Sequence, residues 1–150
     1  MQKKAIYIIR KGKGGWEKEK DFKLRDGYDG EFRDKICAKD SSLYISSHIK
    51  HSIYWYTSDG APNKLISEPV RLKHPRYLEV DSTGKLVVCD YGNKRLQVYD
   101  PESRAWQILM QDLPSAPIAL ALSSNRMWVV ISQYKLGIPW KHKLCKYEAQ

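Results

Sequence analysis

The segment from Pro75 to Leu113 constrains the fold of this sequence most, because four short apolar runs alternate in it with turn residues. Asp-Ser-Thr-Gly, Asp-Tyr-Gly-Asn and Asp-Pro-Glu-Ser separate the runs, and such residues favour tight turns. The runs themselves are β-branched or alternate polar with apolar residues, as strands do. They lie at residues 77–80, 86–89, 95–99 and 105–109. The segment therefore predicts a four-stranded antiparallel meander of roughly forty residues.

The same pattern recurs on both sides of this segment. An aliphatic residue followed three positions later by Tyr occurs three times, with the tyrosines at Tyr56, Tyr99 and Tyr147. These tyrosines are 43 and 48 residues apart, a period typical of β-propeller blades. Apolar runs at 43–46 and 127–130 fall in the frame of the second strand, each after a short polar turn. The sequence therefore predicts an all-β fold, a β-propeller fragment made of four-stranded antiparallel blades.

The repeats divide the chain into four parts of one propeller-type domain. Residues 1–32 are expected to form two strands of an incomplete blade, 33–72 and 73–113 one blade each, and 114–150 an incomplete three-stranded blade. This gives little more than three blades, whereas propellers usually close with four to eight. Because an open arc exposes apolar end faces, we expect either closure within the chain or self-association of two chains.

The composition fits a folded protein of one domain. The chain has 150 residues, 42% of them hydrophobic, with 5 Trp and 10 Tyr. No apolar run approaches the roughly 20 residues of a membrane helix. The apolar run near the amino end is also too short for a signal peptide. We therefore expect a cytoplasmic protein with no membrane partner. The 3 cysteines are far apart and show no paired metal spacing, so neither a disulfide, a metal nor a cofactor is expected.

The run from Pro75 to Tyr99 resembles the NHL repeat. The matching features are a proline, a strand ending near Asp, a Gly turn, a hydrophobic strand ending in Asp, then Gly-Asn, a basic residue and a further strand. Here they are Pro75, Asp81, Gly84, Leu86–Cys89, Asp90, Gly92, Asn93, Arg95 and Leu96–Tyr99. The other repeats are degraded, with Ser47, Ile49 and Lys50 in place of the Asp and Gly-Asn, and a longer loop at 133–140.

The resemblance extends over about residues 33–147 and is closest to the carboxyl-terminal propellers of tripartite-motif proteins. Nothing similar to their RING and B-box domains is found in the sequence. Four residues of the best repeat, Asp90, Gly92, Asn93 and Arg95, are expected to stabilise the blade. Asp90 and Arg95 would tie the turn to neighbouring backbone. Gly92 would adopt a backbone conformation closed to other residues.

In a propeller, the loops between second and third strands, and those leading to the next blade, emerge on one face. The side chains expected there are basic or aromatic: His48, Lys50, Lys73, His74, Arg76 and Tyr91. The formal charge of +9 fits an anionic partner. We expect a protein-interaction platform for an unidentified partner. The alternative is single-stranded RNA, whose phosphates basic groups neutralise and whose bases could stack on Tyr91. The resemblance supports this alternative, since some tripartite-motif propellers bind RNA on that face.

A third alternative is a metal-dependent enzyme, because some similar propellers are lactonases or lyases. Such enzymes gather acidic or His ligands from several blades around the central channel. The 4 His residues of this chain do not fall at equivalent positions beside carboxylates. The sequence therefore predicts a non-catalytic protein.

Overall fold

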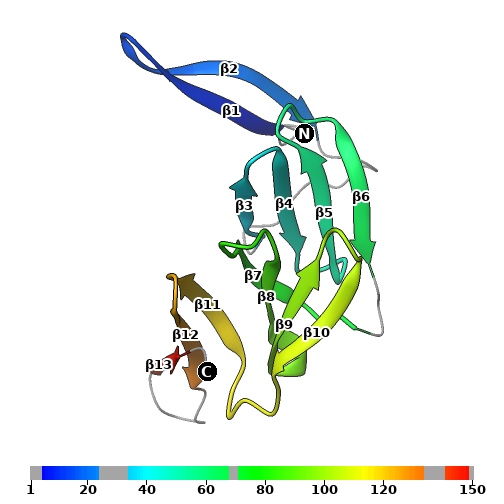
Figure 1. Cartoon of the computed structure of the whole chain (residues 1–150), viewed down its shortest axis with the longest axis vertical. Coiled ribbons are helices and arrows are strands. Elements are labelled where there is room, and N and C mark those ends of the chain that lie inside the picture. Colours follow the sequence, from blue (N-terminus) through cyan, green and yellow to red (C-terminus); the bar gives the residue numbers. More distant parts are fainter. Residues whose placement is uncertain (1–4, 24–33, 68–70, 134–140, 149–150) are drawn as a thin grey trace.

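A computed structural model of the chain describes residues 5–23, 34–67, 71–133 and 141–148. Within these ranges, the regular structure consists of thirteen strands and one single-turn 3-10 helix. The strands form separate antiparallel sheets that follow one another along the chain (Figure 1). The prediction of an all-β, antiparallel fold is therefore confirmed.

In each sheet, strands that follow one another in sequence are neighbours, so each sheet is a meander. The first sheet is a hairpin of β1 (Ala5–Gly12) and β2 (Gly15–Lys23). The second contains β3 (Ile36–Lys39), β4 (Ser42–Ser47), β5 (Ser52–Thr57) and β6 (Pro62–Ser67). The third contains β7 (Pro75–Val80), β8 (Leu86–Asp90), β9 (Arg95–Asp100) and β10 (Ala105–Met110). The fourth contains β11 (Pro117–Leu122), β12 (Arg126–Gln133) and β13 (Lys141–Glu148).

Local turn chemistry explains why the strands begin and end where they do. Between β7 and β8, Asp81 Oδ1 accepts hydrogen bonds from the backbone N–H groups of Thr83 (2.8 Å) and Lys85 (3.0 Å). Gly84 has a φ of 87°, in the left-handed region that other residues rarely adopt. Between β8 and β9 lies the 3-10 helix η2 (Tyr91–Asn93). Most of the longer loop expected at 133–140 lies outside the described residues.

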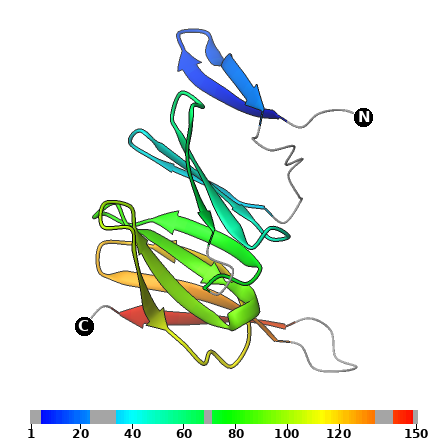
Figure 2. The ribbon, with the colours of Figure 1, turned by 90° about the vertical axis from the view of Figure 1, so that its right-hand side faces the viewer.

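The sheets stack as layers (Figure 2). Apolar side chains pack between the second and third sheets and between the third and fourth. Strand β8 lies at the centre, since all five of its residues are buried. Its alternate side chains point to opposite faces of the sheet. Leu86 and Val88 pack toward the second sheet, while Val87 and Cys89 pack toward the fourth. Each buried Leu or Val side chain contributes roughly 1.5–3 kcal/mol by its burial. Stacking on both faces therefore holds the successive sheets together.

The amino-terminal hairpin lies at the end of this stack opposite to β11–β13 (Figures 1 and 2). Ile6 packs against a cluster of the second sheet formed by Leu43, Ile45, Tyr54 and Tyr56. Other large side chains of the hairpin remain in solvent: Tyr7, Ile9 and Trp16 are 58%, 55% and 73% exposed. The described residues contain no helix with the length and apolar character needed to cross a bilayer.

Candidate binding face

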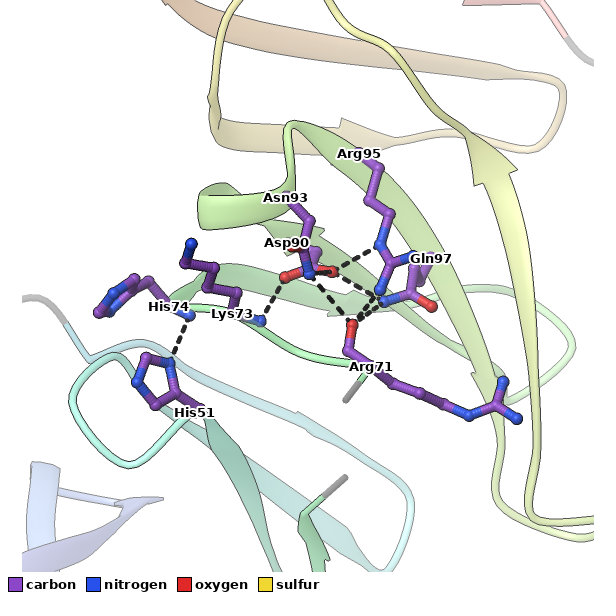
Figure 3. Close-up of polar contacts among 8 residues, drawn as sticks. All are labelled: His51, Arg71, Lys73, His74, Asp90, Asn93, Arg95 and Gln97. Carbon is purple, nitrogen blue, oxygen red and sulfur yellow. Dashed lines mark hydrogen bonds and ion pairs between the residues drawn. The ribbon is translucent and has the colours of Figure 1, made fainter. Parts of the chain in front are cut away.

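Asp90, the last residue of β8, is the centre of a polar network (Figure 3). Its side chain is fully buried and accepts four hydrogen bonds. Oδ1 accepts from the backbone N–H of Lys73 at 2.7 Å. Oδ2 accepts from Asn93 Nδ2 at 2.8 Å, Arg95 Nε at 2.7 Å and Gln97 Nε2 at 2.9 Å. These donors offset the cost of burying a carboxylate.

The same donors bind the chain segment that leads into β7. The carbonyl oxygen of Arg71 accepts from Asn93 Nδ2 at 3.2 Å, from Gln97 Nε2 at 3.0 Å and from Arg95 Nη2. Through Asp90 and Arg71 the network fixes residues 71–73 against the connection between β8 and β9. The segment between two successive sheets is thereby held in place.

Gly92 has a different role from the expected one. Its φ lies outside the left-handed region, so the expectation of a conformation closed to other residues is wrong for this position. Lys94 adopts the left-handed conformation instead, with a φ of 50° at the end of η2. At Gly92 the requirement is space: the backbone N–H donates to Lys73 O at 2.7 Å, and a Cβ would lie 2.6 Å from Lys73 Cγ.

Three histidines meet beside this network. His48 and His51 belong to the turn between β4 and β5, and His74 precedes β7. The ring centroids of His48 and His74 are 4.6 Å apart, and those of His51 and His74 are 4.2 Å apart. A turn of the second sheet thus contacts the segment that enters the third. Burial of His51, with smaller contributions from His74 and Lys73, lowers its pKa from the ordinary histidine value.

Hydrogen bonds define which ring nitrogens of this pair carry a proton. His51 Nδ1 accepts from the backbone N–H of His74 at 2.9 Å, so this nitrogen is unprotonated (Figure 3). His74 Nδ1 lies 3.0 Å from the carbonyl oxygen of His48. Since a carbonyl oxygen only accepts, His74 Nδ1 carries a proton. His51 is therefore held neutral, whereas His74 already donates through Nδ1.

Tyr91 and Arg76 extend the histidine cluster. The Tyr91 ring lies edge-on to His48, with a centroid distance of 6.0 Å. The Arg76 guanidinium carbon lies 5.4 Å from the centroid of the same ring, in a cation–π contact. Lys50 and Lys73 lie in the two adjoining loops and are exposed. We call this surface the loop face, and it consists of His48, Lys50, His51, Lys73, His74, Arg76 and Tyr91.

Six of these residues were expected from the sequence. The structure brings His48, His74, Arg76 and Tyr91 into ring contact and places Lys50 and Lys73 in the loops beside them. His51 was not expected at this face. A signal existed, because His51 lies three positions after His48 in the turn between two expected strands.

A cavity of about 840 Å³ opens at the other ends of the strands, beside the β7–β8 and β11–β12 turns. Val87, Val98, Met110, Leu122 and Met127 line it, and all five belong to the apolar cluster between the third and fourth sheets. The cavity is therefore the open edge of the core.

Metal ligands and thiols are two kinds of catalytic group that the described part of the chain could supply. No group of three or more His, Cys, Asp or Glu residues there could hold a metal ion. Burial raises the pKa of the Cys37 thiol to about 12 and raises that of Cys89 as well. Neither thiol is therefore poised to act as a nucleophile at neutral pH.

The segment that contains most of the Asp90 network matches a known repeat family. Residues 72–99 match the NHL repeat. The matched range contains the complete Asp90 network apart from Arg71, and it ends at Tyr99, the last residue but one of β9. No curated protein is significantly similar in sequence.

Two solved lyase structures have a similar fold. A streptogramin B lyase is 13% identical, with a TM-score of 0.63 over 95% of this chain and 47% of that protein. The virginiamycin B lyase from Staphylococcus aureus, solved in selenomethionine-substituted form, is 16% identical, with a TM-score of 0.56 over 76% of this chain and 40% of that protein. The chain thus spans less than half the length of either lyase. At these identities the similarity shows the fold, a fragment of a β-propeller, and not an activity.

Proposed function

We propose that this chain is a non-catalytic binding module and that its loop face docks a protein partner. The observation that carries this proposal is the convergence of cationic and aromatic side chains from two successive sheets on one surface. Arg, Tyr and His supply charge and flat contact area together, a combination favoured at protein interfaces. The NHL repeat supports the proposal, since NHL propellers commonly mediate protein interactions.

Charge reversal on the loop face tests this proposal. We expect Lys73→Glu combined with Arg76→Glu to weaken binding of captured cellular partners at least tenfold, because like charges then oppose the partner. The matched control is Lys85→Glu with Arg104→Glu, which changes the same charge in turns at the opposite ends of β8 and β9. Quantitative affinity capture with the three proteins measures the effect. Equal partner binding by the loop-face variant and the wild type would reject the loop face as the docking surface.

Single-stranded RNA is the second candidate for the same surface. Exposed Lys50 and Lys73 could neutralise phosphates, and Tyr91 could stack a base. Arg76 already lies over one face of the Tyr91 ring, however, and that face is closed to a base while the contact remains. This arrangement favours a protein partner over RNA.

We also propose that the chain, expressed alone, associates with a second copy of itself. The hairpin exposes large apolar side chains at one end of the stack, while a three-stranded sheet lies at the other. Two copies together have about the length of one of the solved propellers.

A further inference from the structure

We propose that the outer strand β10 binds an extended, uncharged segment of a partner protein by strand addition. A large apolar side chain of this segment enters the cavity that Leu109 and Met110 line. The loop face contains no residue of β10, so this second surface goes beyond the proposed function. Either proposal can fail without the other.

The outer edge of β10 offers backbone groups to an added strand. Among the described residues, β9 is the only neighbour of β10 in the sheet (Figure 1). Their pairing is regular from Ala105 to Ile108 and is interrupted by a bulge before Met110. In such a ladder alternate residues bond the partner strand, and those between direct their N–H and C=O groups outward. Residues 105–108 can therefore pair with one short extended segment.

The last strand of each sheet is an outer strand, and β10 is the one among those described that carries no charge. Charged side chains and proline at a sheet edge discourage the addition of another strand. β6 begins with Pro62 and contains Lys64. β10 consists of Ala-Trp-Gln-Ile-Leu-Met, so it lacks both safeguards. The charged residues of the other two outer strands are Glu17, Lys18, Glu19, Lys20, Asp21 and Lys23 in β2, and Lys141, Lys143, Lys146 and Glu148 in β13.

The exposed side chains of β10 define the chemistry of the added segment. Ile108 and Leu109 are 46% and 45% exposed, so an apolar surface lies beside the free backbone groups. A charged side chain placed against this surface would lose hydration and gain no ionic partner from β10. Apolar or hydroxyl side chains would cover Ile108 and Leu109 without that cost. The edge therefore suits an uncharged segment with strand-forming residues.

The cavity between the third and fourth sheets lies on the face that an added strand would extend. Glu79 pairs with Val87, Val87 with Val98, and Val98 with Gln107, which forms one row across the sheet. Paired residues of neighbouring strands share a face. The first three members of this row line the cavity. A residue added next to Gln107 continues the row, so its side chain points to the face of the cavity. Strand addition combined with a side-chain pocket is a known mode of peptide recognition.

The experiment measures binding of the fluorescein-labelled peptide Lys-Lys-Thr-Val-Thr-Phe-Thr-Val-Thr-Lys-Lys by fluorescence anisotropy. The terminal lysines keep the peptide soluble and oppose non-specific attraction to a chain of charge +9. We expect saturable binding that slows amide hydrogen exchange at residues 105–108, because the added strand accepts from their outward N–H groups.

Two altered peptides separate the backbone from the side chain. N-methylation of every residue in the uncharged centre removes its N–H donors and should weaken binding about tenfold. Replacing the central Phe by Ala keeps all the backbone groups but removes the side chain proposed to enter the cavity. This peptide should also bind about tenfold more weakly, because less apolar surface leaves water.

Three variants of the protein locate the site. Gln107→Lys places a charge at the edge and should weaken binding about tenfold. Asn63→Lys is the matched control, because it adds the same charge at an exposed position of the outer strand β6, and it should bind like the wild type. Tyr91→Ala alters the loop face without changing the charge and should also bind like the wild type. Thermal unfolding checks that each variant is folded.

Several outcomes would overturn the proposal and leave protein docking at the loop face intact. They are no peptide binding, equal binding of the N-methylated and parent peptides, and equal binding by Gln107→Lys and the wild type. Equal binding of the Phe and Ala peptides would reject the cavity as the anchor. Loss of binding in Tyr91→Ala alone would move the peptide to the loop face. Exchange at residues 105–108 that slows with protein concentration, without peptide, would assign the edge to a second copy and reject a partner segment.

Discussion

The turn between β8 and β9 needs space for a close contact and one residue with a left-handed backbone. The sequence pattern assigns both needs to the glycine of the Gly-Asn pair, but in the structure Gly92 meets the first and Lys94 the second. Gly92 provides space, because the backbone of η2 approaches Lys73 too closely for a side chain. Lys94 provides the left-handed backbone at the end of η2. A pattern of residue types reveals that a turn is present, but two neighbouring residues can exchange these roles. The close approach of Lys73 depends on a segment about twenty residues away, which local turn preferences do not contain.

We expect Gly92→Ala to destabilise the protein by about 1–3 kcal/mol, since the added methyl group overlaps Lys73 Cγ and Lys73 O. Urea unfolding followed by fluorescence should show a lower midpoint with an unchanged slope. Gly14→Ala is the matched control, because the nearest atom to its Cβ is Glu17 Oε1 at 3.8 Å. A Gly92→Ala midpoint equal to that of the control would show that the loop moves aside at little cost.

At the scale of elements, the strands could be read from the sequence because their information is local. The runs at 86–89 and 95–99 have strand composition and lie between turn residues, and they form β8 and β9. The repeat of about forty residues predicted which strands group into one meander. The contact of His51 with His74 was not predictable in this way. It depends on how the second sheet packs against the third, through strand side chains such as Tyr44 and Leu78 that belong to neither loop.

The Asp90 network joins β8, η2, β9 and the segment before β7, so its removal should affect all four. We expect Asp90→Ala to cost about 3–5 kcal/mol, because it leaves the largely buried Arg95 and three further donors without their carboxylate. Lys85→Gln removes an exposed ion pair with Asp100 at 3.8 Å and should leave the stability nearly unchanged. Chemical denaturation of both variants measures the difference. Similar losses would mean that water or a neighbouring group replaces the Asp90 carboxylate.

At the scale of the whole molecule, stacking on both faces makes each sheet depend on its neighbours. The third sheet is covered on both sides, by the second and by the fourth. The hairpin covers one side of the second sheet through Ile6, while its own outer residues remain uncovered. This is the expected condition of an arc of propeller sheets, whose stability grows as neighbours are added. The end surfaces are therefore where another copy would bind.

The hairpin residues Ile9 and Trp16 provide the test of self-association. Both are more than half exposed and belong to an end of the stack, where a second copy would bury them. We expect light scattering to give the mass of a dimer at micromolar concentration, and Ile9→Lys with Trp16→Lys to give the monomer. The control is Ile49→Lys, which introduces a charge at an equally exposed residue in the β4–β5 turn and should leave the dimer intact. A stable wild-type monomer would reject association. A dimer that survives both hairpin substitutions would reject the hairpin as the contact, and with it a two-fold pair in which each end is buried against the other.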